Sequence, residues 1–187
     1  MSARPSTIIT FLVLVILAAG GRLLEPLWCF TPMAAVAMFS GFYFRDLRIA
    51  ALVPLAAMAF SDVFLPAYDG VAVALAVYGA FLLPLFLGRR LQKHEWSLRP
   101  LAYSLLPATV FFLTTNLAIW MFRPWYEPNL AGLVECYTAA IPFFRWMLMG
   151  DLFYVAAIFG VYALATDFNW APRRKKALAR VTAERRD

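Results

Sequence analysis

The sequence has little charge, two cysteines and a single histidine. Charged residues make up 15% of the 187 residues and hydrophobic residues 63%, against about 25% and roughly 45–50% in typical soluble domains. A soluble fold of this length could not hide so much apolar surface from water. The composition therefore excludes a water-soluble enzyme, a disordered chain and a nucleic-acid-binding module.

Familiar catalytic and metal-binding motifs are also missing. No GxxxxGKS/T, HExxH, CxxC or GxSxG sequence occurs, so the chain cannot hydrolyse a nucleotide through a P-loop. The lone His94 falls in a polar loop, where we expect it to be solvated rather than a ligand. Cys29 and Cys136 are too few for a disulfide framework, although one bridge between them stays open.

What the sequence does contain is a series of six apolar stretches. They cover approximately residues 7–24, 28–44, 47–65, 71–88, 101–122 and 139–165. A helix needs about 20 apolar residues to cross ~30 Å of hydrocarbon, and the period-two alternation of barrel strands is absent. We therefore predict an all-α integral membrane protein, a bundle of six transmembrane helices that forms one domain over residues 1–187.

The basic residues gather at alternate ends of these stretches. With the N-terminus in the cytoplasm, the inner segments hold 14 of the 17 basic residues. These are Arg4, Arg45, Arg48, Arg89, Arg90, Lys93, Arg99, Arg173, Arg174, Lys175, Lys176, Arg180, Arg185 and Arg186. This positive-inside pattern predicts that both termini are cytoplasmic.

The same charge bias predicts the surroundings of the two ends of the chain. We expect residues 171–187 to form a basic cytoplasmic tail attracted to anionic lipid headgroups, so the net charge of +6 needs no nucleic-acid partner. Residues 1–20 resemble a signal peptide in layout. We favour a retained first span, because its removal would leave an odd number of helices.

A few polar side chains fall inside the apolar stretches, where charges cost ~2.5–3.5 kcal/mol on insertion scales. They are Asp62 near the outer end of the third, Asn116 within the fifth, and Arg145 and Asp151 in the sixth. In one interpretation Arg145 neutralises Asp62 or Asp151 as a buried pair. In the other, these side chains line a polar cavity open to the outside. Both interpretations hold together if the buried ion pair itself lines the cavity.

Aromatic residues gather on the predicted outer side. Trp28, Tyr78, Trp125 and Tyr137 are candidates for the walls of a ligand site, because such sites are mostly apolar with a few placed polar groups. An aromatic belt at the membrane interface is the alternative.

Small residues recur at helical spacing in the fourth stretch. Ala72, Ala76 and Ala80 form two successive steps of four residues, and Ala37 with Gly41 and Ala156 with Gly160 form single steps. Such faces let transmembrane helices approach closely. Most should be contacts inside the bundle, and one exposed face could dock a partner subunit.

Four segments resemble a bacterial family of small, uncharacterised transport-type membrane proteins. They read FTPMAAVAMFSG at 30–41, VYG at 77–79, FFLTTN at 111–116 and AGLVECYTAAIPFFRWMLMGDLFY at 131–154. The resemblance runs from about residue 28 to 165. The chain departs from it at Cys29, where that family usually has asparagine.

The family in turn is similar to the S-components of energy-coupling-factor (ECF) vitamin transporters. Those six-helix proteins bind a vitamin from the outer side, with a membrane coupling subunit and two ATPases, and some relatives are solitary and specific for cobalamin. The resemblance implies a substrate-binding subunit of the bacterial inner membrane for uptake of a vitamin-sized ligand, cobalamin first, with no cofactor of its own. It also implies that Ala72, Ala76 and Ala80 would dock the coupling subunit.

The implied site combines these residues. The candidate substrate-binding residues are Trp28, Cys29, Asp62, Tyr78, Asn116, Trp125, Tyr137, Arg145 and Asp151. Cys29 and Cys136 are candidate cobalt ligands, because a thiolate is a soft ligand. Three alternatives stay open: another ligand such as thiamin, a flavin or haem; an accessory subunit of a membrane complex; and a membrane enzyme that modifies its ligand through a cysteine.

Overall fold

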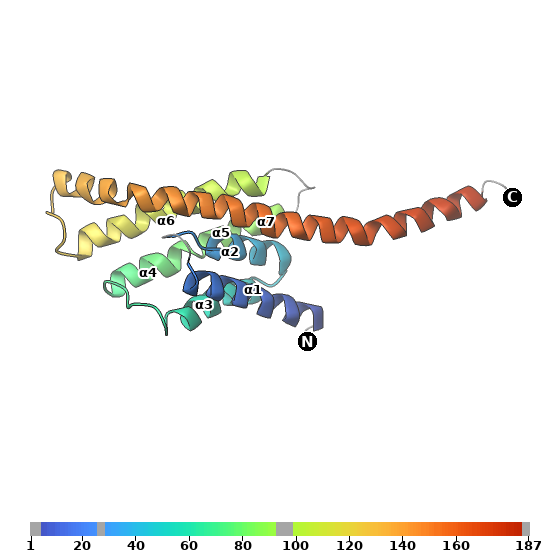
Figure 1. The fold of residues 1–187 in the computed structure, drawn as a ribbon, viewed down its shortest axis with the longest axis horizontal. Helices are drawn as coiled ribbons and strands as arrows, with labels where there is room; N and C mark the ends of the chain where they lie inside the picture. Colours follow the sequence, from blue (N-terminus) through green and yellow to red (C-terminus); the bar gives the residue numbers. More distant parts are fainter. Residues whose placement is uncertain (1–4, 26–28, 93–98, 185–187) are drawn as a thin grey trace.

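The computed structural model consists of helices joined by turns and loops, with no strand among the residues it describes (Figure 1). The description covers the backbone of residues 5–25, 29–92 and 99–184, and side chains as far as residue 166. Its helices are α1 (Pro5–Leu23), α2 (Met33–Tyr43), α3 (Leu47–Ser61), α4 (Val71–Ala80), α5 (Leu83–Leu91), α6 (Arg99–Phe122) and α7 (Leu130–Glu184). The predicted all-α class is confirmed.

Three helical segments are long and apolar enough to cross a membrane. They are Val71–Leu91, which comprises α4 and α5, Arg99–Phe122 and Leu130–Thr166. The other apolar helices, Thr7–Leu23, Met33–Tyr43 and Leu47–Ser61, are shorter. The lengths and composition are typical of a membrane protein, whereas the count of six spans and the side on which each terminus lies stay predictions.

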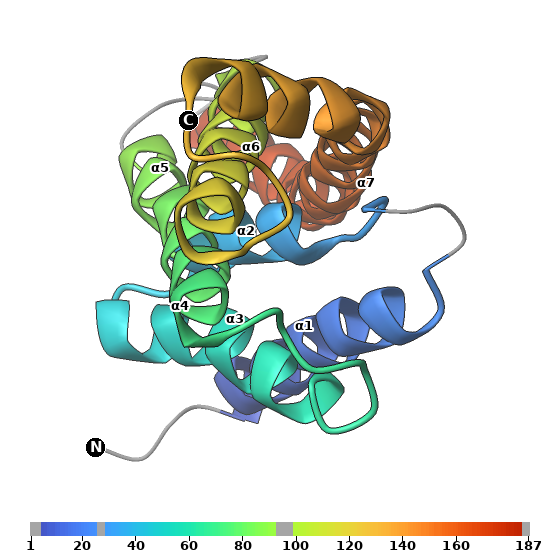
Figure 2. The same cartoon turned by 90° about the vertical axis from the view of Figure 1, so that its left-hand side faces the viewer.

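Helix α2 lies at the centre of the bundle. Its residues from Met33 to Gly41 are all buried, as expected for a helix that is apolar all round. It contacts α1, α3, α5, α6 and α7, and Figure 2 shows it between the α1–α3 layer and the α6–α7 layer. With 11 residues it is only about 16 Å long. The helix begins at Met33 rather than at residue 28, because Cys29 to Pro32 take non-helical conformations.

The predicted fourth span is interrupted. Helix α4 ends at Ala80 and α5 starts at Leu83, with Pro84 in the first turn of α5. Proline lacks an N–H donor and suits the start of a helix rather than its interior. The break brings Ala80, Phe81 and Pro84 to one cavity, described below.

Helix α7 is much longer than the predicted sixth span. It starts at Leu130, where the Asn129 side-chain oxygen accepts a hydrogen bond from the Gly132 backbone N–H at 2.9 Å, which is a helix N-cap. It continues to Glu184 and extends beyond the rest of the bundle (Figure 1). The backbone of the predicted basic tail is thus helical as far as residue 184. Its side chains lie outside the described residues, as do those of His94 and Trp28.

Helices α2 and α5 cross at two glycines. A Cβ atom on Gly41 would overlap the backbone carbonyl of Leu85, and one on Gly88 would overlap the backbone carbonyl of Met38. This reciprocal contact is the close approach that small residues permit between apolar helices. It confirms Gly41 as an internal contact residue, whereas nothing lies within 4 Å of a Cβ on Gly160.

Candidate functional site

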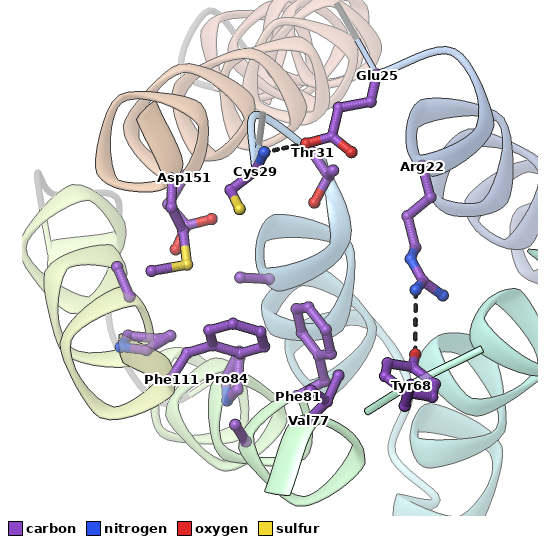
Figure 3. Close-up of a pocket in the computed structure, with 15 residues that line it drawn as sticks. Arg22, Glu25, Cys29, Thr31, Tyr68, Val77, Phe81, Pro84, Phe111 and Asp151 are labelled. Atoms are coloured by element: carbon purple, nitrogen blue, oxygen red, sulfur yellow. Dashed lines mark hydrogen bonds between the residues drawn. The ribbon is translucent and has the colours of Figure 1, made fainter. Parts of the chain in front are cut away.

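A cavity of about 190 Å³ lies between the helices. Figure 3 shows Asp151 and Cys29 on one side, Arg22 and Tyr68 on the other, and aromatic and proline side chains along the floor. The lining residues are Arg22, Glu25, Cys29, Thr31, Ala34, Tyr68, Val77, Ala80, Phe81, Pro84, Pro107, Ala108, Phe111, Met147 and Asp151. The cavity therefore has apolar walls with polar groups at two ends, the usual composition of small-molecule sites.

Asp151 supplies the polar group on α7. Its side chain is 4% exposed, and Oδ2 has no hydrogen-bond partner among the described residues. The neighbouring Gly150 is in tight contact with Phe30, since a Cβ atom there would lie 3.1 Å from the Phe30 Cα. Phe30 also packs on Tyr154, with ring centroids 5.4 Å apart. These contacts hold α7 against the segment before α2 and fix where Asp151 enters the cavity.

At the opposite end of the cavity, Arg22 and Tyr68 belong to a hydrogen-bonded cluster, which we call the Arg22–Asp62 cluster. Arg22 Nη1 lies 2.7 Å from Asp62 Oδ1 and also donates to Ser61 Oγ at 2.7 Å. Arg22 Nη2 donates to the Tyr68 hydroxyl at 3.1 Å. The Tyr68 and Tyr78 hydroxyls donate to the Asp62 carboxylate at 3.0 Å and 2.7 Å. The cluster joins α1, α3, α4 and the α3–α4 loop.

Cys29 lies at the cavity in a left-handed backbone conformation, with φ of 66°. Asparagine adopts this conformation more readily than most residues, which fits the asparagine typical of the resembling family. The Cys29 backbone N–H donates to the Glu25 carboxylate. Burial, with a smaller contribution from the charge of Glu25, raises the pKa of the Cys29 thiol to about 11. The thiol is therefore protonated at neutral pH.

The raised pKa predicts slow alkylation of Cys29. In a Cys136→Ser background, we expect the rate with iodoacetamide to rise about tenfold per pH unit from pH 7 to pH 10, because only the thiolate reacts. An ordinary thiol, with a pKa near 8.5, would level off above about pH 9. Intact-mass measurement over this pH range gives the rates, and a plateau near pH 9 would contradict the raised pKa.

The structure brings together only part of the predicted site. Cys29 and Asp151 line the cavity, and Asp62 and Tyr78 belong to the Arg22–Asp62 cluster. Trp28 lies outside the described residues. The two cysteines are free and do not share a site, because the Cys136 thiol donates to the Asn116 carbonyl at 3.5 Å. Among the described residues no group of three or more His, Cys, Asp or Glu could hold a metal ion.

Four predicted site residues lie away from this cavity. The Asn116 amide donates to the Phe112 carbonyl within α6 at 2.7 Å, and the Tyr137 hydroxyl donates to the Leu113 carbonyl at 2.7 Å. Trp125 is 54% exposed and stacks under the Arg123 guanidinium, 5.4 Å from the ring centroid. Arg145 is exposed on α7. These side chains do not line the cavity that contains Asp151, so the structure does not bring them together with it, and their role in substrate binding stays a prediction.

The predicted pairing of Arg145 with Asp62 was wrong. Arg22 is the cation that neutralises Asp62, while Asp151 Oδ2 has no partner in the described part of the chain. The alanine face needs a further correction. Ala80 is buried and lines the cavity, so it is not available to a docking partner. For the half-buried Ala72 and Ala76, docking stays a prediction.

Sequence analysis missed Arg22, Tyr68, Phe81 and Phe111. A usable signal existed for Arg22, which ends the first apolar stretch on the same predicted side as Asp62. Opposite charges at the ends of neighbouring spans favour a pair. No comparable signal marks Phe81 or Phe111, since phenylalanines occur throughout the spans.

Comparison with known proteins gives one match. The model of a family described as "Family of unknown function (DUF6580)" matches residues 2–174. No curated protein and no solved structure matches the chain. The family description names no ligand and no activity, so the resemblance to S-components stays a prediction.

Proposed function

The chain belongs to the DUF6580 family of unknown function, and we propose from its cavity that it binds a small molecule. In this proposal the chain is a membrane-embedded protein that serves uptake of that molecule. The cavity between α2, α4, α5, α6 and α7 holds the ligand. The observation that carries this proposal is a cavity with apolar walls whose buried carboxylate, Asp151, has an oxygen without a partner among the described residues. Ionisable groups inside membrane proteins typically mark substrate pathways.

The proposed topology has six membrane segments with both termini in the cytoplasm of a bacterial inner membrane. The charge bias supports it, and so does the burial of α2 from Met33 to Gly41. A helix of about 16 Å can serve inside a bundle, because its ends contact protein rather than lipid. The Arg22–Asp62 cluster and Glu25 then lie toward the outer side, where the ligand enters.

Energy for transport would come from a partner, because the chain has no P-loop. An S-component-like role with an ECF coupling subunit and ATPases meets this need, and a solitary protein would move its ligand downhill. The exposed guanidinium of Arg145, within the apolar segment of α7, supports a partner subunit. A cation in a membrane span favours an acidic neighbour.

Cobalamin is a second ligand candidate, because Cys29 lines the same cavity and could supply a thiolate to cobalt. The cavity of about 190 Å³ is smaller than the ~300–1,000 Å³ typical of ligand pockets. A corrinoid would therefore require the helices to separate. The geometry supports a more compact ligand better.

Blocking the cavity tests the proposal. Ala108 on α6 is 1% exposed and lines the cavity, so the larger side chain of Ala108→Leu should project into it and leave less room for a ligand. We expect protein purified in native lipid discs to release a bound small molecule on denaturation, and the variant to release at least about tenfold less. Mass spectrometry of the released molecules gives identity and amount, and would identify a corrinoid directly.

The matched control is Ala102→Leu, which places the same side chain at an exposed position of the same helix. It should release the wild-type amount. The proposal fails if wild-type protein releases no small molecule in stoichiometric amount, or if Ala108→Leu releases as much as the wild type.

A further inference from the structure

The cavity contains a carboxyl oxygen that no described residue satisfies. Asp151 is 4% exposed, and its Oδ2 lacks a hydrogen-bond partner among the described residues. A buried polar atom without a partner is costly. In Figure 3 the carboxylate points into the cavity, above Phe111. A ligand that donates a hydrogen bond at this position would satisfy it.

The charges around the cavity select the kind of ligand. Arg22 is the one cation among the lining residues that the structure describes, and it is already neutralised by Asp62 at 2.7 Å. The remaining charged lining residues are the acids Glu25 and Asp151. A negatively charged ligand would therefore meet two acidic side chains and no free cation, whereas a cationic ligand could form an ion pair with either acid.

The apolar walls suit a compact, flat ligand body. The rings of Phe81 and Phe111 have centroids 5.0 Å apart and are inclined by 49°, and Pro84 and Met147 complete the surface. Aromatic faces attract cations, most strongly where water is excluded. Charge pairing is likewise stronger in surroundings of low dielectric constant.

We propose that the cavity binds a small organic cation, whose protonated nitrogen donates to Asp151 and whose apolar body packs against Phe81 and Phe111. This inference rests on the proposed binding function and narrows its ligand to one chemical class. In this inference Asp151 selects the charge of the ligand. The Arg22–Asp62 cluster supplies polar groups at the other end of the cavity, and its charges are already paired with each other.

Three probes of nearly equal size test the charge preference. Benzylamine is a cation at neutral pH, benzyl alcohol is neutral and benzoate is an anion. We expect calorimetry on the full chain in zwitterionic lipid discs to show benzylamine binding at least about 100-fold more tightly than the other two. Asp151→Asn keeps the shape of the side chain and removes its charge, so it should abolish this preference.

Two further variants complete the test. Glu135→Gln removes an exposed carboxylate from the same helix and should leave all three affinities unchanged. Ala108→Leu projects into the cavity and should abolish benzylamine binding. A folding measurement separates binding from damage: because Asp151 Oδ2 has no hydrogen-bond partner among the described residues, Asp151→Asn should raise the Tm of the protein without added ligand.

The outcomes separate this inference from the proposed function. Suppose that benzyl alcohol or benzoate binds as tightly as benzylamine and that Ala108→Leu abolishes that binding. The cavity then binds ligands but does not select cations, so this inference is overturned while the proposed function still stands. It is also overturned if benzylamine does not bind, or if Asp151→Asn binds it as tightly as the wild type. The proposed function fails only on the ligand-release experiment.

Discussion

Replacing Gly88 with alanine is expected to destabilise the bundle strongly. A Cβ atom at this position would overlap the Met38 backbone carbonyl of α2, and a backbone atom cannot move aside as a flexible side chain can. Overpacking a tight core costs about 1–3 kcal/mol and occasionally more, and we expect the upper end here. Yield of monodisperse protein and Tm in detergent measure the effect.

The reciprocal position provides an internal check. Gly41→Ala should act similarly, because its Cβ atom would overlap the Leu85 carbonyl. The double variant should lose less than the sum of the two, since a single separation of α2 from α5 relieves both overlaps.

Gly160→Ala is the matched control. Its Cβ atom would have no neighbour within 4 Å, so it should stabilise α7 by about 0.5–1 kcal/mol. Wild-type yield and Tm for Gly88→Ala would contradict the α2–α5 crossing.

Replacing Asp62 with asparagine is expected to destabilise the protein by about 3–5 kcal/mol, the usual range when one partner of a buried ion pair is removed. The side chains of Arg22 and Asp62 are 14% and 21% exposed, so solvent screening favours the lower end of that range. The change leaves Arg22 without its counter-charge. Tm in detergent and resistance to denaturation by added sodium dodecyl sulfate report the loss.

A double replacement tests whether the charge imbalance is the cause. Arg22→Leu combined with Asp62→Leu removes both charges and should recover much of the lost stability. Asp69→Asn, in the same loop as Tyr68, should have little effect. If Asp62→Asn is as stable as the wild type, or if the double variant is less stable than the single one, the Arg22–Asp62 cluster does not hold α1 to α3.

The helical class followed from the sequence because apolar stretches of this length permit few structures in lipid. The ends of the helices did not follow from hydropathy. Hydropathy joined residues 71–88 into one span, whereas Pro84 starts a new helix. It also began the second stretch at residue 28, because hydropathy does not register that Cys29 has positive φ. Small-residue spacing marked both Gly41 and Gly160 but could not show which has a facing helix.

The candidate site was only partly predictable for a related reason. Asp62 and Asp151 were found because charges are rare in apolar spans. Hydropathy does not show which way a side chain faces, yet helix geometry does. Arg145 and Asp151 are six residues apart, so they project about 120° from each other. Met147, four residues before Asp151, shares its face and its cavity. Arg22 was missed because it lies near the end of the first apolar stretch and α1, where a charge was not taken as a sign of a buried partner.

A structure of the full chain in a lipid disc, solved with the small molecule it retains on purification, tests the central claim most directly. The account predicts that the ligand lies between Asp151 and Phe111, with a nitrogen within hydrogen-bond distance of the Asp151 carboxylate and the Arg22–Asp62 pair intact at the opposite end. Close-packed side chains or an acyl chain in place of the cavity, with the retained molecule bound elsewhere, would contradict it.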